Sequence, residues 1–206
     1  MLQNRVDPFG NLIKTEARGA WTGTRGLIHN DKQEIVRPFK LKAWITCKLE
    51  FKGRKRKVMS PGLYTELFFL DEATAFAAGH RPCCECRRED FNKFKSSWLS
   101  GNPEYHYDKK TSIRGIDSVI HEERINSTRS KLTFEEDINN IPDGSFILLD
   151  DEPCLVFENE IFLWSPFGYS KGMTFPNREK LIVLTPRSMV NAFRAGYLPQ
   201  IAQLPS

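Results

Sequence analysis

This sequence contains no long run of apolar residues. A membrane-spanning helix needs roughly 18 or more of them in succession, and no window of the chain comes near that length. The first residues, MLQNRVDPFGNLIK, also lack the apolar core of a secretory signal peptide. These absences lead us to expect a soluble cytoplasmic protein without a membrane partner.

Cysteine is scarce and unevenly placed. Of the five cysteines, three fall within residues 83–86. Such crowding makes a poor disulfide framework, whereas grouped thiols are typical of a metal or thiol site. Internal repeats and low-complexity segments are missing too, which excludes repeat architectures.

The composition that remains is that of a folded protein. The 206 residues are 40% hydrophobic and 12% aromatic, enough to bury a core as one domain or two small ones. The formal net charge is +4. This mild positive bias permits nucleic-acid binding without requiring it.

The most specific stretch of the sequence runs from residue 63 to residue 86. An apolar strand at 67–70 ends at Asp71, a favourable helix N-cap. A short Ala-rich helix is predicted at 72–78, and Gly79 follows where a helix C-terminus favours positive φ. The turn at 83–86 then carries a Cys-x-x-Cys before a second helix begins. This order is typical of a zinc knuckle.

Cys83 and Cys86 have the spacing of two ligands of one tetrahedral zinc ion. Cys47 lies on the apolar face of a predicted strand and is expected to point towards the core or the knuckle, whereas Cys84 is too close to Cys83 to join the same ion. The alternative is that the cysteines hold no metal and pack as reduced thiols. The candidate ligands are Cys47, Cys83, Cys86 and His29, with His80 or water as alternatives to His29.

The run Ala77-Ala78-Gly79-His80-Arg81-Pro82-Cys83-Cys84-Glu85-Cys86 resembles the N-terminal zinc-binding domain of the Ada family of alkylation-repair proteins. The match is strong over 67–86 and extends weakly back to Trp44. The resemblance implies a zinc-stabilised, treble-clef-like module that binds DNA. It also implies that Cys47 matches the thiolate that accepts a methyl group, while Phe51 stands where a further cysteine ligand is expected.

Residues 41–60 predict a β-hairpin with its turn at Lys52-Gly53. Its positive charges would contact the phosphates of double-stranded DNA, or would simply form a solvated face. The candidate DNA-binding residues are Lys52, Arg54, Lys55, Arg56, Lys57, Arg81, Arg87 and Arg88.

Residues 1–40 predict a Gly- and Arg-rich arm that packs on the body through Trp21. The alternative is a loop that presents Arg18, Arg25 and His29 to a phosphate or a metal. Two known motifs are excluded. The sequence GTRG lacks the Gly-Lys-Ser/Thr ending of a P-loop, and no His-x-Glu precedes Cys83 as a zinc deaminase requires.

The fold class predicted is α+β: a hairpin with a zinc knuckle, then helices, then a small antiparallel β unit. Helical spacing places Phe91, Phe94 and Trp98 on one buried face, and residues 113–126 predict another helix. Short strands separated by turns follow from 141 to 184, and Thr185-Pro186 opens a last helix. The expected divisions are an arm (1–40), the zinc module with helices (41–134) and the β-rich unit (135–206), which could share one core.

These features predict a zinc-binding protein that interacts with DNA, in repair or processing. Two alternatives stay open. One is a metal-dependent nuclease, with possible bases or ligands at His29, His121, Glu122 and Glu66. The other is a structural zinc protein that binds another protein through its C-terminal β unit.

Overall fold

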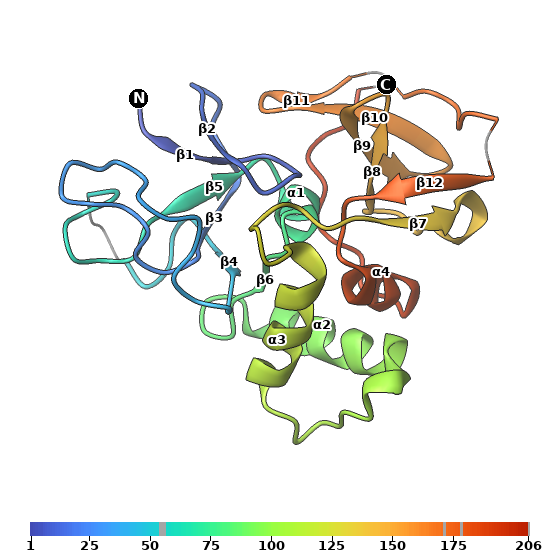
Figure 1. Cartoon of the computed structure of the whole chain (residues 1–206), viewed down its shortest axis with the longest axis horizontal. Coiled ribbons are helices and arrows are strands. Elements are labelled where there is room, and N and C mark those ends of the chain that lie inside the picture. The colour runs from blue at the N-terminus through green and yellow to red at the C-terminus, as the bar shows by residue number, and fades with distance from the viewer. Residues whose placement is uncertain (54–56, 171, 178, 206) are drawn as a thin grey trace.

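The structure is a computed structural model and describes residues 1–53, 57–170, 172–177 and 179–205. Within these ranges the strands form two six-stranded sheets, and helices lie between and beneath them (Figure 1). This mixture confirms the predicted α+β class. None of the helices in the described ranges has both the length and the apolar character needed to cross a membrane.

The first sheet has the strand order β2-β1-β5-β3-β4-β6. Its pairs are antiparallel except β1 with β5 and β4 with β6. Residues 1–40, predicted as an arm, supply three of these strands, and β3 lies inside the sheet between β5 and β4. The strands are β1 (Gln3–Val6), β2 (Leu12–Lys14), β3 (Trp21–Thr24), β4 (Ile45–Cys47), β5 (Leu67–Phe69) and β6 (Arg81–Pro82).

The hairpin predicted over residues 41–60 is not formed by the described residues. β4 covers only Ile45–Cys47, and its two edges pair with β3 and β6. Because both edges are occupied, no following strand can pair with β4. The chain turns away through Lys52 and Gly53, which both have positive φ, at 52° and 65°.

The second sheet is antiparallel throughout, with the order β11-β10-β9-β8-β12-β7. It confirms the predicted antiparallel unit, and Cys154 is buried in it as expected. The strands are β7 (Phe134–Asp137), β8 (Phe146–Leu149), β9 (Glu152–Phe157), β10 (Glu160–Ser165), β11 (Gly168–Tyr169) and β12 (Lys180–Val183).

The helices begin and end close to the predicted positions. The carboxylate of Asp71 accepts a hydrogen bond from the Thr74 backbone at the start of the first helix, and Gly79 beyond its end has φ +83°. Phe91, Phe94 and Trp98 are buried as their spacing predicts. The α-helices are α1 (Glu72–Ala77), α2 (Arg88–Gly101), α3 (Ile113–Arg124) and α4 (Arg187–Arg194), with 3-10 turns η1 (Pro103–Tyr105) and η2 (Ile138–Asn140).

The last helix differs in its cap. We expected Thr185 at the N-cap, but α4 begins after Pro186. The hydroxyl of Thr185 instead accepts a hydrogen bond from the backbone of Phe146 in β8, at 2.9 Å. The residue therefore joins α4 to the second sheet.

The short helix α1 connects the layers of the molecule (Figure 1). Ala75 packs in the cluster of the first sheet, Phe76 in the cluster of α2, α3 and α4, and Ala73 and Ala77 in a cluster of the second sheet. Each residue of the helix is buried. Parts of the chain before and after residue 135 therefore share a core through α1.

Candidate metal centre

The turn that carries Cys83 and Cys86 is fixed to the first sheet. β6 runs parallel to β4, with Thr46 opposite Pro82. The ladder continues one step further, because the backbone N–H of Cys83 donates to the carbonyl of Thr46 at 2.9 Å. The turn therefore begins directly beside the end of β4, and α2 starts just beyond it.

Cys47 is the last residue of β4 and meets this turn. The Sγ atoms of Cys47, Cys83 and Cys86 all lie within 4.8 Å of one another. Ligand sulfurs of a tetrahedral zinc site are roughly 3.8 Å apart, given Zn–S bonds of about 2.3 Å. The three thiols thus lie close enough together for a thiolate-preferring metal ion, although Cys47 and Cys83 are 36 positions apart in the sequence.

The three thiols share protons unequally. The hydrogen bond from Cys47 lowers the pKa of Cys83 to about 5. The same bond, together with burial, raises the pKa of Cys47, and burial raises that of Cys86. Cys83 is therefore the thiol of the three that loses its proton most readily. A bound metal ion would replace the remaining thiol protons.

A cavity of about 470 Å³ opens beside the sulfurs. The three cysteines line it together with aromatic side chains and two carboxylates, Glu66 and Glu85. The three cysteines would therefore hold a metal ion at the wall of this cavity. Cys47 points towards the knuckle, as expected, from the half-buried face of β4, whereas Thr46 on the other face is fully buried.

The two histidines considered as fourth ligands are held elsewhere. The ring of His29 is hydrogen bonded to the Thr65 hydroxyl at 2.6 Å and to the Ser60 carbonyl at 3.3 Å. His80 is fully buried and accepts a hydrogen bond from Arg25. The structure therefore brings together three of the four predicted ligands and does not bring His29 to them. Cys84 is exposed and lies outside the group.

Two of the predicted DNA-binding residues are buried in ion pairs. Arg81 forms a two-pronged pair with Asp117 on α3, at 2.7 and 2.8 Å. Arg87 pairs with Glu72 at 2.6 Å and with Asp90 at 2.9 Å. Both arginines are less than 5% exposed. These ion pairs hold the cysteine turn and α2 in place, and the two arginines are not available to DNA. A positive charge in the sequence does not by itself distinguish such a buried structural arginine from an exposed one.

Three other predicted cations are exposed: Lys52, Lys57 and Arg88. Arg54, Lys55 and Arg56 lie outside the described residues. Lys48, which was not among the predicted residues, is also exposed and lines the cysteine cavity directly after Cys47. Its position next to a candidate ligand was the signal that could have identified it.

The residues considered for a nuclease do not gather. Glu66 lines the cysteine cavity, and its carboxylate accepts a hydrogen bond from the Met59 backbone at 2.8 Å. His121 lies on α3 against Phe39, and burial lowers its pKa to about 4. In the described part of the chain, the one group of possible metal ligands is the cysteine triad.

Comparison with known proteins gives no match: no protein-family model, no curated protein and no solved structure matches the chain.

Proposed function

We propose that this chain is a zinc-thiolate protein that binds double-stranded DNA. The observation that carries the proposal is the convergence of Cys47, Cys83 and Cys86, whose sulfurs lie within 4.8 Å of one another. Thiolates at this separation favour zinc among the common cellular metals. Zinc would join the end of β4 to the turn before α2.

The DNA-binding part of the proposal is supported by exposed cations around the cysteine cavity. Lys48 lines the cavity, and Lys52 and Lys57 are adjacent in sequence to its lining residues Phe51 and Val58. The carboxylates of Glu66 and Glu85 on the cavity wall would repel phosphate. DNA would therefore contact the rim through its backbone, and the cavity itself would not receive a phosphate.

Metal analysis tests the first part of the proposal. Protein purified without chelators should contain about one zinc per chain. Cys47→Ser should lose most of it, while the matched control Cys84→Ser should keep it, because Cys84 is exposed and outside the group. Wild-type protein without zinc, or equal zinc in both variants, would contradict the proposal.

Salt-dependent binding to a DNA duplex tests the second part. Replacing Lys48, Lys52 and Lys57 with alanine should weaken binding and reduce the slope of log affinity against log salt by roughly 2 to 3 if each lysine contacts a phosphate. The control removes three exposed charges elsewhere, at Lys109, Lys110 and Arg114. No measurable binding at low salt, or equal slopes in the two variants, would remove DNA from the proposal.

No second activity is proposed. Of the residues considered for a nuclease, Glu66 lines the cysteine cavity, but the two candidate histidines are hydrogen bonded elsewhere, and in the described part of the chain no further group of metal ligands forms around it. Methyl transfer to Cys47 would leave only two thiols on the metal, since Phe51 stands in place of a further cysteine.

A further inference from the structure

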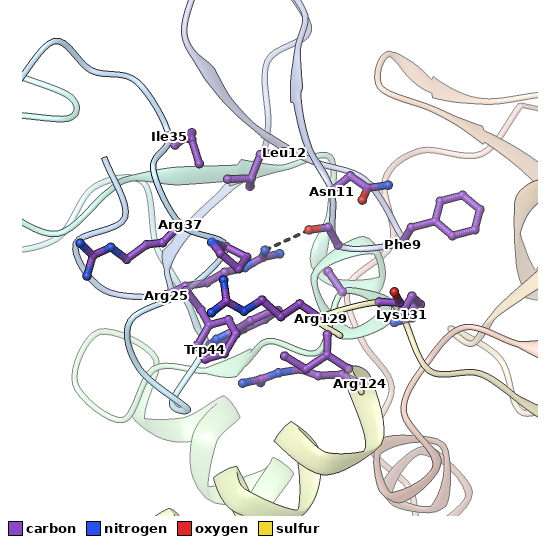
Figure 2. Close-up of a pocket in the computed structure, with 16 residues that line it drawn as sticks. Phe9, Asn11, Leu12, Arg25, Ile35, Arg37, Trp44, Arg124, Arg129 and Lys131 are labelled. Atoms are coloured by element: carbon purple, nitrogen blue, oxygen red, sulfur yellow. Dashed lines mark hydrogen bonds between the residues drawn. The ribbon is translucent and has the colours of Figure 1, made fainter. Parts of the chain in front are cut away.

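A second and larger cavity, of about 650 Å³, lies apart from the cysteines (Figure 2). Its walls come from the loop between β1 and β2, the segment at 35–39, Trp44 before β4, and the chain from the end of α3 to residue 131. Ligand pockets for small organic molecules have volumes of this order.

Five positive side chains line this basic pocket: Arg25, Arg37, Arg124, Arg129 and Lys131. No aspartate or glutamate is among its described lining residues. In Figure 2, Arg25, Arg124 and Arg129 gather around Trp44, whereas the Arg37 guanidinium lies further out. Positive charges this close together repel one another, and a bound anion would offset that repulsion.

Arg25 is buried at the floor of the pocket, with 2% of its surface exposed. Its Nη1 donates to the Gly10 carbonyl at 2.9 Å, and its Nε donates to His80 at 3.2 Å. Its Nη2 has no hydrogen-bond partner among the described residues. A Cβ on the pocket-lining residue Gly10 would lie 3.6 Å from this nitrogen, which places Nη2 at the pocket wall.

Arg124 is buried to the same degree, with 1% exposed. It donates to the carbonyls of Gly79 and Lys42 at 2.8 and 2.7 Å, and in the described part of the chain its Nε finds no acceptor. Gly79 is required here, because a Cβ would lie 2.5 Å from Cδ of Arg124. The conformation after α1 and the basic pocket therefore depend on the same glycine.

One indole ring fixes both guanidinium groups. The Cζ atoms of Arg25 and Arg124 lie 3.9 and 3.6 Å from the ring centre of Trp44. Contact with an aromatic face stabilises a cation without neutralising it. Both arginines are thus rigidly placed while keeping their charge and a free donor.

Burial in the pocket disfavours the charged forms of its basic side chains. Burial lowers the pKa of Arg25 to about 9 and that of Lys131 to about 7, and it lowers the pKa of Arg124 as well. Two carboxylates outside the pocket lining offset part of this charge: Asp7 acts on Arg25 and Lys131, and Asp117 acts on Arg124. The oxygens of Asp7 accept hydrogen bonds from Asn11, and those of Asp117 accept hydrogen bonds from Arg81. A bound anion would supply the missing counter-charge.

We propose that the basic pocket binds a phosphate-bearing ligand of about mononucleotide size. Forked guanidinium donors match the oxygens of a phosphoryl group. The pocket also offers apolar and aromatic wall, from Leu12, Ile35 and Phe39, for an organic body attached to the phosphate. This proposal does not depend on zinc or on DNA binding at the cysteine centre.

Titration calorimetry on the full chain at constant ionic strength tests the proposal. The probes are inorganic phosphate, AMP, adenosine, and short oligonucleotides with either a 5′-phosphate or a 5′-hydroxyl end. We expect saturable binding of AMP with a Kd below about 1 mM, weaker binding of phosphate, and none of adenosine. If only the 5′-phosphorylated oligonucleotide binds, the phosphate belongs to a nucleic-acid end and the pocket is confirmed with that source.

The variants separate the pocket from general charge effects. Arg129→Ala changes an exposed rim residue and should raise the Kd roughly tenfold. Arg25→Lys keeps the charge but removes Nη2, the donor without a partner among the described residues, and should raise the Kd by a similar factor. The control Arg114→Ala removes an exposed charge outside the pocket and should change the Kd less than about twofold.

Three results would overturn the proposal: no saturable binding of any phosphate-bearing probe, equal binding of AMP and adenosine, or unchanged affinity in both Arg129→Ala and Arg25→Lys. Cys47→Ser should bind AMP like the wild type. Loss of DNA binding at the cysteine rim therefore cannot be mistaken for failure of the pocket.

Discussion

Buried arginines occur in two regions of this molecule, and their surroundings differ. Beside the cysteine turn, Arg81 faces the carboxylate of Asp117, and Arg87 faces that of Glu72. In the basic pocket, the partners of Arg25 and Arg124 among the described residues are backbone carbonyls, the rings of His80 and His121, and the Trp44 ring. The first pair is complete within the chain and has a structural role. Among the described residues, no carboxylate is hydrogen bonded to Arg25 or Arg124, and this is why we infer an anionic ligand there.

The largest expected effect is the loss of stability when the Arg81–Asp117 ion pair is broken. Asp117→Asn would leave Arg81 as an unpaired buried charge and should lower the free energy of unfolding by about 3–5 kcal/mol. Glu122→Gln, which changes an exposed carboxylate on the same helix, should have almost no effect. Urea denaturation of the two variants measures the difference, and equal stabilities would show that Arg81 does not need its partner.

Metal removal should affect the cysteine region strongly and the basic pocket hardly at all. A zinc chelator should lower the Tm of wild-type protein and of Cys84→Ser, because the proposed zinc ion would join β4 to the turn before α2. It should leave the Tm of Cys47→Ser unchanged. The affinity for AMP should be the same before and after chelation. A large change in AMP affinity would mean that the two regions are coupled.

A carboxylate placed in the basic pocket should act as a counter-charge for its cations, as Asp117 does for Arg81. Ser130 lines the pocket and is exposed, and Ser130→Asp would place a negative charge beside Arg129 and Lys131. We expect the free protein to gain up to about 1 kcal/mol and AMP affinity to fall severalfold. Ser127→Asp is the control in the same loop, outside the pocket lining. Thermal unfolding and calorimetry distinguish the two variants.

The smallest effect is that of pH on anion binding. Lys131 faces Arg124, Arg25 and Asp7 and donates to the Ala77 carbonyl, and burial lowers its pKa to about 7. Affinity for sulfate, which does not titrate in this range, should fall a few-fold as pH rises from about 6 to 8.5, because Lys131 loses its proton. Lys131→Met should remove this dependence, whereas a slope of the same size in the variant would assign it to another group.

The same shift predicts the sign of a stability change. The folded pKa of Lys131 is about 7, below the ordinary value of 10.5. Between these pH values the unfolded chain binds more protons than the folded one, so the free energy of unfolding should rise with pH across this window in the absence of an anion. Denaturation at pH 7 and pH 9, for wild type and Lys131→Met, measures it.

Local features of the chain were predictable because their signals are local. The N-cap at Asp71, the positive φ of Gly79 and the buried stripe of Phe91, Phe94 and Trp98 follow from neighbouring residues alone. The convergence of Cys47 with Cys83 and Cys86 was expected from spacing and from the family resemblance, and the structure shows these sulfurs close together. Zinc and DNA binding remain predictions.

Pairings between distant segments were not predictable in the same way. The sequence around β4 resembles half of a hairpin, yet β3 and β6 occupy both of its edges. Strand pairing depends on which segments the folded chain brings together, and the sequence of one strand does not specify its partners.

The sequence by itself determined the α+β class, the approximate positions of the helices and the grouping of Cys83 and Cys86 in one turn, because these depend on residue type and short spacing. Tertiary structure alone decided which buried arginines form an ion pair with a carboxylate and which do not. Arg81 meets Asp117 across 36 positions, while Arg25 meets Arg124 across nearly a hundred, around one tryptophan. Whether a buried charge finds its counter-charge is settled only when the chain has folded.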